Sequence, residues 1–199
     1  MGLAQVYRKQ LAIYHASLGW SSDLWCGLEM PQIWDCLTRS LQELKASDFG
    51  FEVQVFVLMG THAHLLFSSR RGLEQYAIEE LVKLALKNKP VNKKTLETNS
   101  GLVEFERPYF IETVDSFRQL LNVHKYIYRN PVEAGLSQNV EDYPYSTLGV
   151  LLGRLKSQLI VVDMLHVVQD PCRILKWLNQ SPSAELYGWS SLKSNRNGF

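Results

Sequence analysis

Cysteine is scarce in this chain of 199 residues: Cys26, Cys36 and Cys172 are the only three, and their spacing is wide and uneven. Such spacing is typical neither of a disulfide framework nor of a zinc ribbon. Long apolar runs are also missing, and the N-terminal stretch carries Arg8 and Lys9 without a small-residue cleavage site. The sequence therefore predicts a cytoplasmic protein in a reducing compartment, with no signal peptide and no transmembrane helix.

An excess of charge of one sign is lacking as well, since 21 Lys and Arg face 20 Asp and Glu and the net charge is +1. DNA-binding proteins of this size are usually more basic, because neutralising phosphates releases counterions and drives affinity. Two local groups of basic residues remain, Arg70 with Arg71 and the lysines between positions 83 and 94. Each group fits either a nucleic-acid patch or a solvated helix face.

The composition, at 46% hydrophobic, is sufficient for one main domain with a buried core. Hydrophobic spacing and breakers predict strands at Leu11–Leu18, Phe51–Leu58 and Thr61–Phe67 and helices at Pro31–Lys45, Gly72–Lys89 and Val114–Asn130, the last ended by Pro131. This order is typical of an α+β split β-α-β sandwich, an antiparallel sheet with helices on one face. We expect the main domain to span residues 1–153 and residues 154–199 to form a C-terminal extension.

Two histidines, His62 and His64, flank Ala63 in the second strand of the predicted hairpin. Because side chains alternate across a strand, both imidazoles point to the same face, about 7 Å apart along the backbone. Two neutral imidazoles can share one cation, although a histidine pair in a strand is often coincidental. Apolar residues on both sides indicate a core strand. Burying two polar rings there costs free energy unless a ligand or hydrogen bonds compensate for it.

The helix predicted at Val114–Asn130 carries two tyrosines on different faces. At about 100° per residue, one arc should pack on the sheet, and it contains Phe117, Leu120, Leu121, His124, Ile127 and Tyr128. Tyr126 falls on the opposite side with Gln119 and Asn122, and Asn130 stacks one turn beyond it. This polar stripe is also what the solvated side of an amphipathic helix would look like.

A phenol such as Tyr126 needs help to act as a phosphoryl nucleophile, because its ordinary pKa is about 10. A metal ion held by two histidines and an amide oxygen can stabilise charge at a phosphate and at the leaving 3′ oxygen. A phosphotyrosine link keeps the energy of the broken phosphodiester, so rejoining strands needs no nucleotide cofactor. No glycine-rich phosphate loop is required, and the sequence has none.

Three segments together resemble the signature blocks of the REP-associated tyrosine transposases, which are single-tyrosine HUH transposases of bacterial insertion sequences. These segments are LMGTHAHLLF at 58–67, YIYRNPVEAGL at 126–136 and EDYPYS at 141–146. The resemblance covers residues 11 to 153 in the right order. It implies a ferredoxin-like antiparallel sheet that bears the histidines, with residues 1–153 as the catalytic domain.

By position in these blocks, the resemblance assigns Tyr126 as the nucleophile and His62, His64 and Asn130 as ligands of Mg²⁺ or Mn²⁺. Tyr128 is the rival phenol, and the helical arc places it on the core face. The residues expected to contact DNA are Arg70, Arg71, Lys87 and Arg107. The segment 143–145 is expected to cover the edge of the sheet.

The implied function is a metal-dependent endonuclease and strand transferase for single-stranded DNA, which cleaves next to a hairpin through a 5′-phosphotyrosine intermediate. Its partner would be single-stranded or hairpin DNA and not a membrane, and both a monomer and a homodimer remain open. The alternative is a catalytically silent, domesticated hairpin-binding regulator, which the low net charge favours. A metallohydrolase that activates water is disfavoured, because the sequence offers no obvious carboxylate base nearby.

Overall fold

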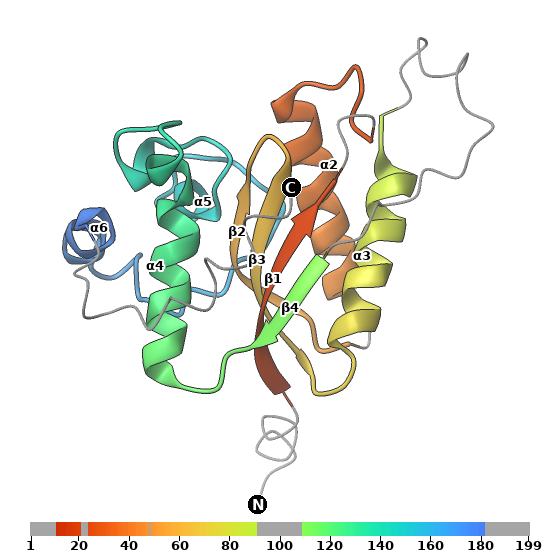
Figure 1. Cartoon of the computed structure of the whole chain (residues 1–199), viewed down its shortest axis with the longest axis horizontal. Coiled ribbons are helices and arrows are strands. Elements are labelled where there is room, and N and C mark those ends of the chain that lie inside the picture. Colours follow the sequence, from red (N-terminus) through yellow and green to blue (C-terminus); the bar gives the residue numbers. More distant parts are fainter. Residues whose placement is uncertain (1–10, 21–23, 48, 91–108, 182–199) are drawn as a thin grey trace, which may run out of the picture.

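The computed structural model describes residues 11–20, 24–47, 49–90 and 109–181 (Figure 1). Its elements are strands β1 (Leu11–Gly19), β2 (Glu52–Leu58), β3 (His62–Arg70) and β4 (Tyr109–Thr113), helices α2 (Met30–Lys45), α3 (Glu74–Asn88), α4 (Phe117–Glu133), α5 (Thr147–Leu151) and α6 (Pro171–Asn179), and the 3-10 turn η2 (Val140–Asp142). None of the helices in the described part of the chain is long and apolar enough to cross a membrane.

The sheet has four strands in the order β2-β3-β1-β4, and each neighbouring pair is antiparallel. The β2–β3 hairpin was predicted, and β1 enters between β3 and β4 so that the first and third strands lie at the centre. This is the strand order of a ferredoxin-like fold. The predicted α+β fold with an antiparallel sheet is confirmed.

Helices cover both faces of this sheet, so the expectation of helices on one face is wrong (Figure 1). Helices α2 and α3 share a core with Phe56, Leu65 and Phe67, whereas α4 shares a second core with Val57 and Leu66. The reason lies in β3, whose interior residues are all buried. A strand that is apolar on both sides needs a layer of structure on each of them.

Helix α4 begins and ends differently from the prediction. The Ser116 hydroxyl caps its N-terminus by accepting a hydrogen bond from the main-chain N–H of Gln119 at 3.1 Å. Pro131 lies inside the helix instead of ending it. The helix ends at Glu133 with Ala134 as its C-cap, Gly135 follows with φ +72°, and the N–H of Leu136 donates to the carbonyl of Pro131 at 2.8 Å. The glycine and this six-residue hydrogen bond form a Schellman motif, which is the signal that stops the helix.

The segment that follows α4 covers the outer edge of β2, as predicted for residues 143–145. The Tyr143 hydroxyl donates to the carbonyl of Leu58 at 2.7 Å, and the N–H of Leu58 donates to the carbonyl of Tyr145 at 3.0 Å. Val57 and Ser146 form an isolated antiparallel bridge beyond these contacts. Edge strands with unpaired backbone groups are open to pairing with other chains, and this segment satisfies part of that edge.

The described part of the C-terminal extension packs against α4. Helix α6 begins after Asp170, whose carboxylate accepts from the N–H of Arg173 at 3.2 Å, and its Leu178 is buried in the same core as α4. Before α6, Val161 of the extension forms one isolated parallel bridge with Val53 of β2. The extension thus forms an outer layer over the helix that carries Tyr126.

Candidate active site

His62 and His64 lie at the start of β3 on the face of the sheet that α4 covers. Their rings are edge to face, with centroids 5.0 Å apart and planes at 89°. His64 is buried, His62 is half-buried, and the hydroxyl of Thr61 lies 3.2 Å from Nδ1 of His62. The alternation of the strand therefore brings the two imidazoles together, as the sequence predicts.

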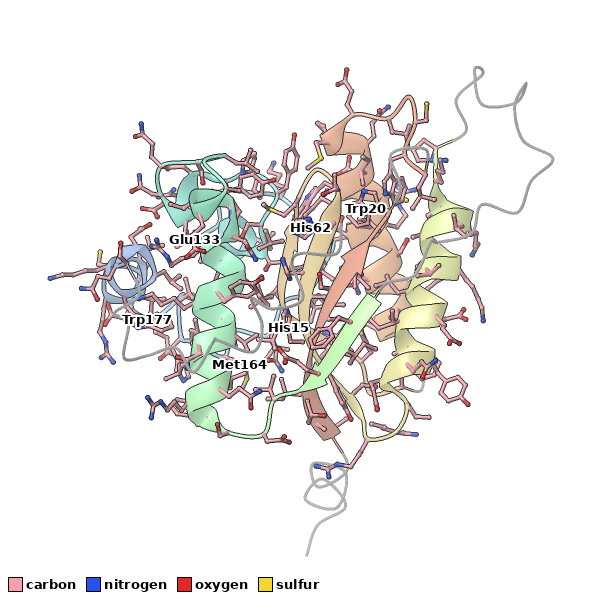
Figure 2. The ribbon with its side chains drawn as sticks, in the orientation of Figure 1. His15, Trp20, His62, Glu133, Met164 and Trp177 are labelled. Atoms are coloured by element: carbon pink, nitrogen blue, oxygen red, sulfur yellow. The ribbon has the colours of Figure 1, made fainter. Side chains whose placement is uncertain are left out.

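Tyr126 also meets these histidines. Its ring centroid lies 5.3 Å from that of His64, with the planes at 75°. The prediction that Tyr126 lies opposite the packed face of its helix is wrong, because its ring packs at the edge of the core between α4 and the sheet. Figure 2 shows His15 and His62 on the sheet side of α4 and Trp177 of α6 on the outer side of that helix.

The periodicity of α4 misleads because both of its sides are covered. The C-terminal extension buries Lys125 and Arg129, which are 5% and 8% exposed, although a solvated helix face would leave such residues open. Lys125 also places its ammonium 5.2 Å from the ring centroid of Trp177. Phe117 was expected on the packed arc but is 71% exposed, since it is the first residue of the helix.

The rival phenol, Tyr128, is fully buried, as the helical arc predicts. Burial raises the pKa of its hydroxyl well above the ordinary value, because the phenolate would lose its hydration there. A buried phenol with a raised pKa cannot reach a DNA strand or readily lose its proton. Of the two tyrosines, the structure places only Tyr126 beside the histidines.

Asn130 lies one helical turn beyond Tyr126, and its side chain is 8% exposed. Its amide nitrogen is buried and has no hydrogen-bond partner among the described residues. A buried polar atom without a partner costs about 1–3 kcal/mol. A rotation of the amide by 180° would present its oxygen at the same place.

The donor set fits a divalent cation only if the amide takes part. Within residues 11–20, 24–47, 49–90 and 109–181, no three His, Cys, Asp or Glu side chains converge closely enough to hold a metal ion. Two imidazoles on one face and a buried, unsatisfied amide one turn from the tyrosine supply nitrogen and oxygen donors that such ions accept. The imidazoles of His62 and His64 and the amide of Asn130 are thus donor types that a divalent cation such as Mn²⁺ accepts.

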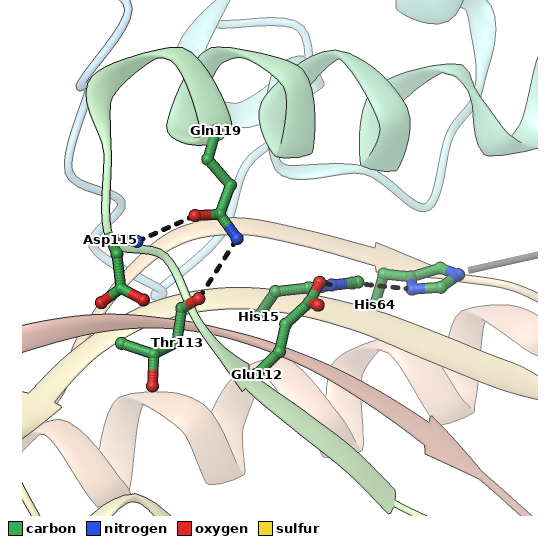
Figure 3. A network of polar contacts seen from close by, with 6 residues as sticks. All are labelled: His15, His64, Glu112, Thr113, Asp115 and Gln119. Atoms are coloured by element: carbon green, nitrogen blue, oxygen red, sulfur yellow. Dashed lines mark hydrogen bonds and ion pairs between the residues drawn. The ribbon is translucent and has the colours of Figure 1, made fainter. Parts of the chain in front are cut away.

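Sequence reasoning missed two residues of the site, His15 and Glu112 (Figure 3). His15 lies on β1, and its Nδ1 is 2.9 Å from a carboxylate oxygen of Glu112 on β4, while its Nε2 is 3.2 Å from Nδ1 of His64. The ring of His15 also lies 5.9 Å from that of Tyr126. A histidine in the middle of an apolar strand was a signal, but its partners follow only from the pairing of β1 with both β3 and β4.

The basic residues predicted to contact DNA do not gather around Tyr126. Arg70 ends β3, eight residues and roughly 26 Å from His62 along the strand. Arg71 follows it in an exposed turn. Lys87 lies on α3, which packs on the other face of the sheet, with its ammonium 3.8 Å from the carboxylate of Glu43. Arg107 lies outside the described residues.

Comparison with known proteins adds one finding on the fold. No protein-family model matches the sequence, and no curated protein matches it. A solved structure of a REP-associated tyrosine transposase bound to a REP hairpin matches with a TM-score of 0.54 and 18% sequence identity, over 76% of this chain and 86% of that one. The chain has the fold of a REP-associated tyrosine transposase. At this identity the likeness establishes the architecture alone.

Proposed function

We propose that this protein is a metal-dependent endonuclease and strand transferase that cuts single-stranded DNA beside a hairpin, with Tyr126 as the nucleophile. One observation carries the proposal: the ring of Tyr126 lies 5.3 Å from that of His64, which in turn lies 5.0 Å from that of His62. A phenol packed against a histidine pair, in the fold of a transposase whose structure holds a REP hairpin, supports phosphoryl transfer to tyrosine.

The reaction begins with attack of the Tyr126 hydroxyl oxygen on the phosphorus of the scissile phosphodiester. A bond forms between that oxygen and phosphorus, and the bond from phosphorus to the 3′ oxygen breaks. The phenol loses its proton and the leaving oxygen gains one, so the products are a 5′-phosphotyrosine and a free 3′ hydroxyl. Attack by a second 3′ hydroxyl reverses these steps and rejoins strands, which requires no nucleotide cofactor.

His62, His64 and Asn130 are the residues that would hold Mg²⁺ or Mn²⁺ in this site. When bound, such an ion polarises a non-bridging phosphate oxygen and offsets the charge that develops on the 3′ oxygen. The chain itself positions the nucleophile, because Tyr126 extends from a helix that is held between the sheet and the extension. Placing the reacting groups on rigid elements lowers the entropy cost of attack.

A second candidate is a silent hairpin-binding protein that acts in regulation. The net charge of +1 favours it, and so does the distance of Arg70 from the histidines, since an active nuclease needs phosphate contacts near its nucleophile. In this case Tyr126, His62, His64 and Asn130 would be retained in a protein that binds the hairpin without cleaving it.

The test uses labelled single-stranded hairpin oligonucleotides with randomised flanks, incubated with Mn²⁺ or Mg²⁺ and resolved on a denaturing gel. We expect a covalent protein–DNA adduct with the wild type and with Tyr128→Phe, the matched control for loss of a tyrosine on the same helix. We expect none with Tyr126→Phe or after chelation. Adduct in Tyr126→Phe contradicts the assignment, and hairpin binding without adduct in either metal favours the regulatory protein.

A further inference from the structure

Three polar side chains form a row across the sheet: Glu112 on β4, His15 on β1 and His64 on β3 (Figure 3). The rings of His15 and His64 both lie beside that of Tyr126. We propose that Glu112 and His15 are positioning residues that fix the tautomer of His64, so that Nε2 of His64 presents its lone pair to a divalent cation. The proposal rests on the proposed function and deepens it, because it concerns the same site.

The direction of the first hydrogen bond follows from the carboxylate. An ionised carboxylate only accepts hydrogen bonds, and Oε1 of Glu112 lies 2.9 Å from Nδ1 of His15. Nδ1 of His15 therefore carries the hydrogen. A neutral imidazole has one N–H and one lone pair, so Nε2 of His15 is an acceptor.

The second hydrogen bond determines the tautomer of His64. Nε2 of His15 lies 3.2 Å from Nδ1 of His64, and both side chains are buried. With an acceptor facing it, Nδ1 of His64 has to be the nitrogen that carries hydrogen, and the lone pair of His64 is then on Nε2. Metal-binding histidines commonly donate their other N–H to a partner in this way, which fixes the tautomer and the orientation of the ring.

The sheet holds this row in place. His15 lies directly across from Glu112 in the β1–β4 register, and the rings of His15 and His64 are nearly parallel, with planes at 24° and centroids 5.5 Å apart. His62 differs, because its Nδ1 faces the hydroxyl of Thr61 at 3.2 Å, and a hydroxyl can donate or accept. The contact with Thr61 by itself selects no tautomer of His62, whereas the row through His15 selects one for His64.

The first measurement reads the tautomers directly in the metal-free full-length protein. Two-bond ¹H–¹⁵N correlation spectra of the imidazoles at pH 8 should show His15 and His64 as Nδ1–H tautomers. Glu112→Ala, at a partly exposed position on the edge strand, should turn both rings into mixtures of tautomers without unfolding the chain. His64 with its hydrogen on Nε2 in the wild type would overturn the proposal.

The second measurement is the affinity for Mn²⁺ by calorimetry. We expect His15→Phe, which keeps a ring but removes both nitrogens, to weaken Mn²⁺ binding by about 10- to 100-fold. His15→Gln should restore much of the affinity, since its amide oxygen can accept from His64. His124→Phe is the matched control for loss of a buried histidine outside the site and should leave the affinity unchanged.

The outcomes separate this inference from the proposed function. Equal Mn²⁺ affinity in the wild type, His15→Phe and Glu112→Ala would overturn the positioning role and leave the nuclease proposal standing. If His15→Phe does not fold, Glu112→Ala decides by both measurements. A wild-type protein that binds no Mn²⁺ would contradict the proposed metal site. It would also contradict the proposal that Glu112 and His15 position a metal ligand.

Discussion

Replacing Arg129 by methionine should release α6 from the helix that carries Tyr126. Arg129 is buried on the outer side of α4, and its Nη1 donates to the carbonyls of Leu178 at 3.3 Å and Asn179 at 3.0 Å. These two residues end α6, where carbonyls lack helical partners and the helix dipole is negative. One guanidinium therefore satisfies the end of α6 and links it to α4.

The magnitude follows from these two contacts. A hydrogen bond with a charged donor contributes about 1.5–3 kcal/mol, while the 3.5 Å ion pair between Arg129 and Glu133 adds little because the Glu133 carboxylate is half exposed. Methionine keeps much of the apolar packing of the arginine stem. We expect the free energy of local opening of α6 to fall by about 3 kcal/mol, which is on the order of a hundredfold in amide exchange rate.

Hydrogen exchange read by mass spectrometry on peptides within 171–179 measures this change. Arg173→Met, on the exposed side of the same helix, is the matched control and should change exchange less than threefold. Peptides from β1 and β3 should keep their protection in both variants. Unchanged protection of α6 in Arg129→Met, or an equal loss in the control, would refute the role assigned to this arginine.

Three further predictions concern stability. Tyr143→Phe removes the 2.7 Å hydrogen bond to the last carbonyl of β2 and should lower the free energy of unfolding by about 1–2 kcal/mol in urea titrations, with no loss if that bond is unimportant. Gly149→Ala places a Cβ 2.7 Å from Leu155 and should cost about 1–3 kcal/mol, whereas Gly60→Ala meets nothing within 4 Å and should cost under about 1; equal costs would contradict the packing of α5. Burial lowers the pKa of His124 to about 4 from its ordinary 6.5, so the unfolded chain takes up this proton first as the pH falls. The histidine should therefore remove about 3 kcal/mol of stability between pH 6.5 and 4, and His124→Phe should flatten that part of the pH profile; an unchanged profile would refute it.

Local patterns were sufficient for the parts of the site that lie within one element. The two-residue spacing of His62 and His64 in an apolar strand predicted their shared face, and the helical period separated Tyr128 from Tyr126. The period placed Tyr126 on the wrong side, because it assumes that a helix has one covered face. The extension, which begins at residue 154, covers the other face of α4. The spacing of residues within the helix carries no information about that distant segment.

Contacts between distant strands account for the rest of what was missed. His15 is opposite Glu112 and diagonal to His64 only because β1 lies between β3 and β4. That order is a property of the whole sheet, and the strand that carries Glu112 was too short to be distinguished from loop by its alternation. The predicted DNA-contacting residue Arg70 is near His62 in sequence, but the two lie at opposite ends of β3. An extended strand separates residues that are only eight positions apart.

The most direct test of the proposed reaction is to locate the covalent bond. The protein–DNA adduct formed with Mn²⁺ on a hairpin oligonucleotide would be digested with protease and nuclease, and the remaining peptide sequenced by tandem mass spectrometry. The account predicts a nucleotide attached through its 5′ phosphate to Tyr126, with a free 3′ hydroxyl on the released strand. A nucleotide on any other residue, or cleavage that leaves no residue modified, would contradict it.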